Sequence, residues 1–549
     1  MDHKKLSEIL FPTTDTTPEH YETKYPDRHL PEGARVTRLG PSPTGFIHLG
    51  NLYGAFADER LAHTGGGIFF LRIEDTDHKR EVEGAIPSLI NSLDYFGIHF
   101  DEGATVDGEK GDYGPYKQSD RAEIYQCYAK DLVRKGLAYP CFCTEEELDS
   151  IRKEQEAIKA NPGYYGKWAK HRNLTLSEII EKLDAGMEYV IRLRSSGNPE
   201  KYFKIIDGIR GELSMPENEM DIVILKKTGI PTYHFAHVID DHLMRTTHVV
   251  RGEEWLSSLP IHFELFNIMG FKLPEYCHTT VLMKMDGDTK RKLSKRKDPE
   301  LSLEYYRNQG YIPEAVSDYM LTILNSNFEE WRSEHPDAPI SEFPFSTEKM
   351  SNSGTLFDLD KLNDVSKETL SRMSEEDIYS YLSAWADLTD PAKAEVIKAH
   401  KDMLLKILAI DRTGPNPRKD LAYCDQIFTF IKYFFDEYFE IENPLPENVN
   451  KEDAAAIIKS YVKNYSHNDD QENWFAKIRD LAVSMGYAAK PKDYKKNPED
   501  YKGHVGHVST VIRIALTGRS NSPDIWEIQQ ILGEKKTMER MNNYLSRYL

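Results

Sequence analysis

The chain has 549 residues, of which 39% are hydrophobic, and a formal net charge of −20 at pH 7. This length predicts roughly three to five domains with buried cores, and the composition excludes a disordered chain. The charge argues against a nonspecific coat for nucleic acids, whereas a local basic surface would still allow specific binding. Five cysteines are too few for a disulfide framework and indicate a reducing compartment, so we expect a cytoplasmic protein. The apolar runs are too short to span a bilayer, and the first residues fit neither a secretory leader nor a transit peptide.

The first elements follow the order strand, loop, helix, strand. Val36 to Leu39 is typical of a short strand, GPSPTGFIHLG of a tight loop and LYGAFADERLA of a helix. The continuous apolar run GIFFLRIED then indicates a parallel strand that is buried on both faces. Residues 35–75 are therefore expected to form one βαβ unit.

The same order returns in the middle of the chain, as THVVRG, EEWLSSLPIHFELFNIMG and CHTTVLMK. Two such halves predict a doubly wound α/β fold, and the hundred or so residues between them predict an inserted α+β domain. Beyond Pro313, apolar residues recur at three- and four-residue intervals, which predicts a mainly helical second half.

These patterns predict a division of the chain into six parts. The expected parts are an N-terminal extension (1–34), a first α/β half (35–114), an inserted domain (115–225), a second α/β half (226–281), a domain that begins with the basic run (282–365) and a helical region (366–549) with a subdomain boundary near 470–490. The basic residues that gather after Lys490 are the first candidates for contact with a polyanion, and a solvated helical surface is the alternative.

The loop TGFIHLGN can hold a phosphate. Gly45 and Gly50 would let the anion approach the backbone at the start of a helix, and His48 could donate a hydrogen bond to an α-phosphate oxygen. An isolated His-x-Gly of this kind is more often a simple turn. The loop lacks GxGxxG and GxxxxGK[ST], which removes the main support for hydride transfer or a P-loop. The similar GHVGHV around His504 and His507 lies in a helical region with no strand before it.

The second basic element is the run KRKLSKRKD after the last parallel strand. Lys292, Lys295 and Arg296 surround Ser294 there, and such runs are usually solvated surface. At the carboxyl end of a strand, however, they suit a loop that closes over a triphosphate. The two elements together indicate attack of a carboxylate on the α-phosphorus of ATP, with lysines stabilising the departing pyrophosphate and Mg²⁺ accompanying the nucleotide.

PSPTGFIHLGN together with KLSKR resembles the two signature motifs of class I aminoacyl-tRNA synthetases. FLRIEDTDHKRE, GPYKQSDRAEIY, YPCFCTEEEL and ALTGRSNSPDIWEIQQILG occur in the order found in bacterial-type glutamyl-tRNA synthetases. The resemblance extends over nearly everything after residue 34. It implies ATP-dependent formation of glutamyl-adenylate and transfer of glutamate to the 3′-terminal adenosine of tRNA(Glu), with activation requiring bound tRNA. It also implies a monomer. In such an enzyme the two α/β halves would be catalytic, the inserted domain would bind the tRNA acceptor end, residues 282–365 would form the signature-loop and stem-contact domain, and the helical region would bind the anticodon.

The resemblance implies roles for individual residues. His48, Lys292 and Lys295 would be catalytic, with His48 as the α-phosphate donor and Lys295 as the pyrophosphate clamp. The residues expected to bind ATP are Thr44, Gly45, His48, Gly50, Asn51, Lys292, Ser294, Lys295 and Arg296, and those expected to bind glutamate are Arg38, Ser42, Glu74, Tyr233, His237 and Arg251. An arginine suits a carboxylate and Glu74 suits an ammonium group.

Three departures from the family pattern matter. Asn51 replaces the last histidine of the first motif, which the glutamyl branch tolerates. His237 stands where the family often has asparagine, so we expect it to affect selectivity or pH dependence. Cys141 and Cys143 match half of a zinc knuckle, but Trp168 and Lys170 occupy the remaining positions with only His171 nearby. Four ligands are not evident, so the sequence predicts structural thiols, no metal site and no zinc.

Other functions stay open at this stage. A shorter relative that glutamylates a tRNA base lacks an anticodon-binding half, and glutaminyl-tRNA synthetases usually end in β-barrels, so both are disfavoured. A catalytically silent tRNA-binding paralogue and a non-discriminating enzyme that also charges tRNA(Gln) remain alternatives. The sequence does not identify the residues that read the anticodon.

Overall fold

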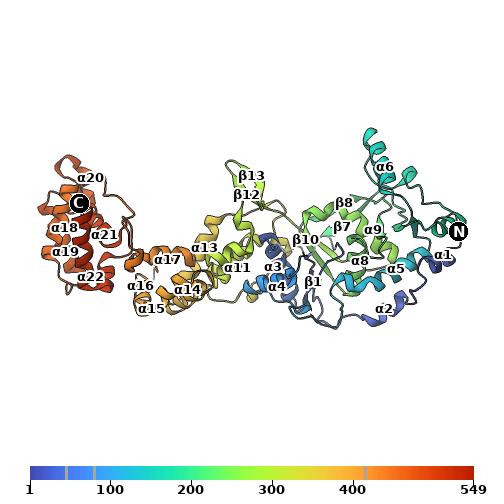
Figure 1. Cartoon of the computed structure of the whole chain (residues 1–549), viewed down its shortest axis with the longest axis horizontal. Coiled ribbons are helices and arrows are strands. Elements are labelled where there is room, and N and C mark those ends of the chain that lie inside the picture. Colours follow the sequence, from blue (N-terminus) through green and yellow to red (C-terminus); the bar gives the residue numbers. More distant parts are fainter. Residues whose placement is uncertain (44–46, 78–81, 413–416) are drawn as a thin grey trace. The chain divides into compact units, whose positions relative to one another are not determined.

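The computed structural model describes residues 1–43, 47–77, 82–412 and 417–549. They form two compact units, whose elements are drawn in Figure 1: unit 1 comprises Met1–Tyr305 and Val316–Asp358, and unit 2 comprises Tyr306–Ala315 and Leu359–Leu549. Within these ranges no helix is both long enough and apolar enough to cross a membrane. The predicted loop residues Thr44 and Gly45 lie outside the described residues.

The first half of the main sheet contains three parallel strands. β1 pairs with β2 and β2 with β3, while the short β4 runs antiparallel at the edge. Phe69, Phe70 and Leu71 are fully buried, as expected for a strand covered on both faces. The predicted βαβ unit is thus present, and its first strand has the predicted bounds. The elements are β1 (Val36–Leu39), α3 (Leu49–His63), β2 (Ile68–Leu71), α4 (Ala85–Tyr95), β3 (Glu102–Ala104) and β4 (Glu109–Lys110).

The second half repeats this arrangement. β10 (His248–Gly252) and β11 (Glu275–Thr279) are parallel, and α9 (Leu259–Met269) connects them. The Thr247 N–H donates a hydrogen bond to the Val36 carbonyl, which places β10 beside β1. Strands therefore run outward from β1 in one direction and from β10 in the other. This is the predicted doubly wound fold, and its topological switch point lies between β1 and β10.

A hairpin from the predicted inserted domain extends the second half. β7 (Tyr202–Asp207) pairs with β8 (Gly211–Pro216) and also reaches β11 through Asp207 and Tyr276. The remainder of that segment forms a separate antiparallel sheet in the order β5, β6, β9. Its elements are α5 (Ala122–Arg134), β5 (Ala138–Cys141), α6 (Glu145–Ala157), α7 (Leu176–Asp184), β6 (Val190–Leu193) and β9 (Val223–Leu225), and α8 (Tyr233–Leu243) follows.

The N-terminal extension is built into unit 1. α1 (His3–Leu10) and α2 (Pro18–Lys24) contribute Leu6, Leu10, Tyr21 and Tyr25 to the core that α5 and α8 share. Arg28 then binds Glu102 with two hydrogen bonds of 2.8 and 3.0 Å. The sequence offered no interpretation of this segment, which the structure shows to be part of unit 1.

Unit 1 ends with a small sheet and three helices. β12 (Leu282–Asp286) lies between antiparallel β13 (Thr289–Lys292) and parallel β14 (Thr355–Leu356). The helices are α10 (Leu303–Gln309), whose last turn belongs to unit 2, α11 (Pro313–Leu324), most of which lies in unit 1, and α12 (Phe328–Glu334).

Unit 2 is helical, as predicted, around one apolar core. The apolar run of residues 394–410 does not form one helix, because the backbone leaves helical geometry at His400 and starts again at Lys401. The helices are α13 (Leu359–Arg372), α14 (Glu375–Thr389), α15 (Pro391–Ala399), α16 (Lys401–Ala409), α17 (Cys424–Ile431), α18 (Lys451–Asn464), α19 (Gln471–Ser484), α20 (Pro491–Lys496), α21 (Val505–Thr517) and α22 (Ile525–Arg547).

Candidate active site

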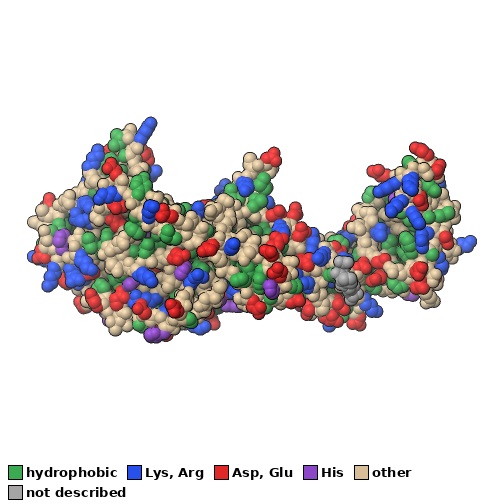
Figure 2. Space-filling model, turned by 180° about the vertical axis from the view of Figure 1, so that it is seen from behind, with side chains coloured by type: hydrophobic (Ala, Val, Ile, Leu, Met, Phe, Trp, Pro, Cys, Tyr) green, Lys and Arg blue, Asp and Glu red, His purple; other side chains and the backbone are tan. Residues whose placement is uncertain are grey.

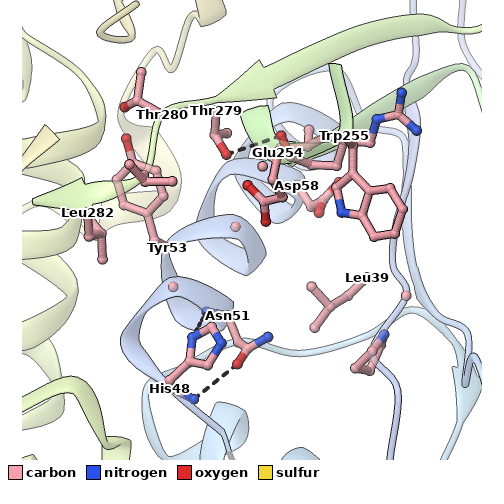
Figure 3. Close-up of a pocket in the computed structure, with 18 of the residues that line it drawn as sticks. Leu39, His48, Asn51, Tyr53, Asp58, Glu254, Trp255, Thr279, Thr280 and Leu282 are labelled. Carbon is pink, nitrogen blue, oxygen red and sulfur yellow. Dashed lines mark hydrogen bonds between the residues drawn. The ribbon is translucent and has the colours of Figure 1, made fainter. Parts of the chain in front are cut away.

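A cavity of about 380 Å³ opens at the switch point of unit 1. The carboxyl ends of β1 and β10 form two of its sides, and the start of α3 forms another (Figure 3). Open α/β sheets bind ligands at this position. Its wall includes Arg38, Gly40, His48, Gly50, Asn51, Tyr53, Asp58, Glu74, Tyr233, Arg251, Glu254, Trp255, Thr280 and Lys292.

His48 and Asn51 form a reciprocal cap at the start of α3. The Asn51 N–H donates to His48 Nδ1 at 3.3 Å, and the His48 N–H donates to Asn51 Oδ1 at 3.0 Å, as Figure 3 shows. Burial and the charges of Lys295 and Lys292 lower the pKa of His48. A neutral imidazole whose Nδ1 accepts carries its proton on Nε2. Nε2 is therefore the ring atom that can donate to an anion at this helix terminus.

The end of β1 is a cluster of buried charges. Arg38 Nε lies 3.2 Å from Asp241 Oδ1 on α8, and Arg72 Nη1 lies 2.5 Å from the same oxygen. Arg72 also donates to Glu74 Oε1 at 2.9 Å and so fixes that carboxylate on the cavity wall. A Cβ at residue 40 would collide with Glu74 Oε1, which explains the glycine after β1. Burial raises the pKa of Glu74, and Arg72 and Arg38 oppose this shift.

The end of β10 holds its arginine differently. Arg251 Nε donates to His278 Nε2 at 3.0 Å, and Nη1 lies 3.0 Å from His262 Nδ1. The guanidinium stacks over Tyr276, 4.5 Å from the ring centroid. Nη2 is buried and has no hydrogen-bond partner among the described residues. A buried donor without a partner is costly, so Nη2 marks a position where a ligand can accept.

Tyr233 and Trp255 lie on the same wall, with their ring centroids 4.3 Å apart and their planes tilted by 35°. His237 lies behind Tyr233, with the two rings nearly parallel at 5.7 Å, and it is fully buried. Its Nδ1 is 2.7 Å from Asp241 Oδ2, and burial lowers its pKa to about 3. Two expectations for this residue are therefore corrected. His237 was expected to bind glutamate, but it does not line the cavity. It was also expected to affect the pH dependence, but its low pKa keeps the ring neutral through the physiological pH range.

The basic loop is shaped by an aspartate that sequence analysis did not single out. Asp298 accepts two hydrogen bonds from Arg291, at 2.6 and 2.7 Å, and one from the Ser294 N–H at 2.8 Å. Arg291 thereby lowers the pKa of Asp298 to about 2. Lys292 reaches the cavity wall, whereas Ser294, Lys295 and Arg296 do not line it. Lys295 nevertheless lies near enough to lower the pKa of His48.

The remaining predicted residues are placed as follows. Ser42 lines a separate pocket of about 160 Å³ that shares His48 and Asn51 with the main cavity. His504 and His507 cap the start of α21 in helical unit 2, whose described residues form no strand before them. Sequence analysis missed Asp241, Arg72, His262 and His278, although the alternation of Arg72 and Glu74 after an apolar strand already placed both on one face.

Cys141 and Cys143 come together with His171. His171 Nδ1 lies 3.4 Å from Cys143 Sγ and 3.8 Å from Cys141 Sγ, and Tyr164 Oη lies 3.4 Å from Cys143 Sγ. The three donors lie close enough together to contact one metal ion, but a structural zinc ion takes four ligands, and His171 Nδ1 also accepts from the Phe142 N–H at 3.1 Å. The absence of zinc therefore stays a prediction, which metal analysis of the purified chain can test.

The comparisons with known proteins agree with this architecture. Residues 35–364 match the family described as tRNA synthetases class I (E and Q), catalytic domain, and residues 494–545 match an anticodon binding domain. The glutamate–tRNA ligase of Acetivibrio thermocellus is 62% identical over 99% of this chain and 100% of its own length. That of Clostridium perfringens is 51% identical with full coverage of both chains.

A solved structure is similar in fold as well. The crystal structure of a glutamate tRNA ligase from Elizabethkingia meningosepticum in complex with its amino acid matches with a TM-score of 0.74 and 27% identity, over 94% of this chain and all of that chain. Motifs, switch-point cavity and relatives therefore agree, and the chain belongs to the class I tRNA synthetases of the glutamate and glutamine (E and Q) family.

Proposed function

We propose that this chain is a glutamate–tRNA ligase whose chemistry takes place in the switch-point cavity of unit 1. In the first step a carboxylate oxygen of glutamate attacks the α-phosphorus of ATP, glutamyl-adenylate forms and pyrophosphate leaves. In the second step a ribose hydroxyl of the 3′-terminal adenosine of tRNA(Glu) attacks the acyl carbon, and AMP leaves. The 62% and 51% identical glutamate–tRNA ligases support this function.

One observation carries the choice of substrate. Arg251 is only 8% exposed and lies on the cavity wall, and its hydrogen-bond partners among the described residues are neutral side chains. Because a buried cation needs an anion, the side-chain carboxylate of glutamate is the expected partner of Arg251 Nη2. Glu74, fixed by Arg72, would bind the substrate ammonium group.

The nucleotide occupies the opposite part of the cavity in this proposal. The start of α3 and His48 Nε2 would bind the α-phosphate, and Lys292 and Lys295 the departing pyrophosphate. Mg²⁺ enters with the nucleotide and neutralises its phosphates. Of the nearby carboxylates, Glu254 is exposed, whereas burial raises the pKa of Asp58 well above its usual range, so Glu254 is the better metal ligand.

The helices of unit 2 are the proposed contact for the tRNA anticodon. Figure 2 shows Lys and Arg side chains on the surface of the C-terminal helices. Several basic residues there are engaged within the chain, since Lys502 pairs with Asp453, Arg519 with Glu442 and Lys536 with Asp436. The exposed lysines Lys492, Lys495 and Lys496, in α20, form no ion pair among the described residues and are our candidates for phosphate contacts.

The five cysteines of the chain are all free thiols, which supports a cytoplasmic location.

Aminoacylation by the purified chain tests this proposal. We expect labelled glutamate, but not glutamine, to be attached to a tRNA(Glu) transcript in the presence of ATP and Mg²⁺. A parallel reaction with tRNA(Gln) shows whether the enzyme discriminates between the two tRNAs. Failure to charge tRNA(Glu) by a preparation that still binds it would refute the proposed activity and favour a silent tRNA-binding protein.

A further inference from the structure

Arg251 differs from the other buried arginines near the cavity in the charge of its partners. Arg38 and Arg72 share Asp241, and Arg121 binds Asp240 at 2.7 Å. The two hydrogen-bond partners of Arg251 within the described chain are imidazoles. The protein therefore orients this guanidinium without balancing its charge.

The first imidazole is fixed by the strand register. Arg251 on β10 lies directly opposite His278 on β11, so both side chains point to the same face of the sheet. His278 Nδ1 is 2.6 Å from Asp207 Oδ2 at the end of β7. Because this carboxylate accepts, Nδ1 carries the proton and Nε2 is left to accept from Arg251 Nε. Asp207 thus sets the tautomer that Arg251 requires.

The second imidazole is held by another histidine. His262 on α9 is fully buried, and its Nε2 lies 2.9 Å from His234 Nδ1 on α8. Since His262 Nδ1 accepts from Arg251, its proton sits on Nε2 and is donated to His234. Burial lowers the pKa of His262 well below its usual value and that of His234 to about 4. Both rings are therefore neutral at physiological pH.

We propose that His262 and His278 are positioning residues that aim Arg251 at the substrate carboxylate through neutral acceptors, so that the charge of Arg251 is reserved for glutamate. The inference rests on the proposed function of the cavity. A carboxylate in place of either imidazole would hold the guanidinium equally well but would neutralise it. An arginine that is already paired gains less from an anionic substrate, and its preference for glutamate over the neutral glutamine falls.

The test compares two variants that differ only in charge at one position, His262→Gln and His262→Glu. The amide of H262Q keeps a neutral acceptor, and we expect the KM for glutamate to rise by about threefold in this variant. In H262E we expect that KM to rise by about thirtyfold or more, with the KM for ATP changed by less than about threefold. The ratio of kcat/KM for glutamate over glutamine should fall at least about tenfold between H262Q and H262E.

A control variant isolates the charge change. His99→Glu introduces the same charge at a side chain that is 71% exposed, and it should leave both KM values unchanged. If H262E does not fold, as judged by circular dichroism, the pair H278Q and H278E provides the same comparison on the other side of Arg251. Equal glutamate KM values within a folded Gln/Glu pair would overturn the inference.

The two proposals fail in different ways. If the unmodified enzyme charges tRNA(Glu) while the Gln and Glu variants behave alike, the proposed activity stands and the role of the imidazoles is wrong. If the unmodified enzyme attaches no glutamate under any condition, the proposed activity is wrong, and this inference falls with it.

Discussion

The ends of β1 and β10 each present a buried arginine to the same cavity, but the two arginines are held in opposite ways. Arg38 is bound to the carboxylate of Asp241, with its Nε 3.2 and 3.3 Å from the two oxygens. Arg251 is held by neutral imidazoles and keeps a buried nitrogen without a partner among the described residues. The comparison teaches that residue type and position at a strand end do not define a role. We infer that the charge of the supporting side chains sets how strongly each arginine can bind an anionic ligand, since Arg251 has no carboxylate partner among the described residues.

Removing the carboxylate from the β1 side should have the largest effect on stability. Asp241→Asn leaves Arg38 and Arg72 buried without the anion that they share, which should cost about 3–5 kcal/mol of unfolding free energy. Urea denaturation of the variant measures this loss. The exposed pair of Arg152 and Glu156 supplies the control, because Glu156→Gln should leave stability unchanged. An Asp241→Asn enzyme as stable as the unmodified one would show that Arg38 needs no counter-charge.

The β10 side should show the opposite division between activity and stability. Arg251→Met removes a cation that no carboxylate of the described chain balances, so we expect the melting temperature to change by only a few degrees. The kcat/KM for glutamate should fall about 10²-fold, since the substrate carboxylate loses its charged partner. Steady-state aminoacylation and thermal denaturation measure the two quantities. A large loss of stability without a change in kcat/KM would reverse the assigned roles of the two arginines.

The contrast between these arginines also marks where sequence analysis stopped. Local features were predictable: the strand Val36–Leu39, the helix that follows the first loop and the doubly wound order all follow from nearby patterns. The sequence assigns both arginines to glutamate, and these roles stay predictions. Nothing near either arginine in sequence shows the side chains that hold it. Asp241 is 203 residues from Arg38, and only the packed fold brings them together.

The same limit applied to the inserted segment and the cysteines. Alternation of residues predicts a strand but not its neighbour, so pairing of the β7–β8 hairpin with β11 could not be inferred. His171 meets the two thiols through the fold of a loop 28 residues away from Cys143. Spacing therefore named the same three donors but did not show that they lie within 4.8 Å of one another.

Changing Asn51, which holds the neutral imidazole of His48, should affect stability and activity less than the two changes above. His48 resembles His262 in being neutral, but its tautomer depends on the Asn51 N–H three residues away. Asn51→Ala removes the side chain that binds the His48 N–H and loosens this cap, which should cost about 1 kcal/mol and lower the rate of ATP–pyrophosphate exchange about tenfold. Asn51→Asp keeps an acceptor for the same N–H and should restore the cap. An unchanged exchange rate in Asn51→Ala would mean that α3 orients His48 without this side chain.

His63 is the opposite case to the neutral histidines beside Arg251, because two carboxylates hold its imidazole. Its Nδ1 and Nε2 each lie 2.8 Å from a carboxylate, of Glu59 and Asp101 respectively. These hydrogen bonds raise its pKa to about 9 from an unperturbed 6.5. A group whose pKa is raised on folding contributes stability that is complete below the unfolded pKa and is lost as the pH rises through the folded value. His63 should therefore stabilise unit 1 fully at pH 6 and lose this contribution between pH 7 and about 10.

The contribution of His63 to the free energy of unfolding should be about 1–2 kcal/mol, because Asp101 is 36% exposed and solvent screens part of the interaction. The measurement is the difference in unfolding free energy between pH 6 and pH 10, compared between the unmodified chain and His63→Gln so that other titrating groups cancel. The unmodified chain should lose more stability over this range than His63→Gln does, and Asp101→Asn should lie between them. Equal losses in the unmodified chain and His63→Gln would mean that His63 is already neutral at pH 6. In that case the charge of neighbouring side chains would not decide the state of a histidine here, and the same argument for the neutral partners of Arg251 would lose its basis.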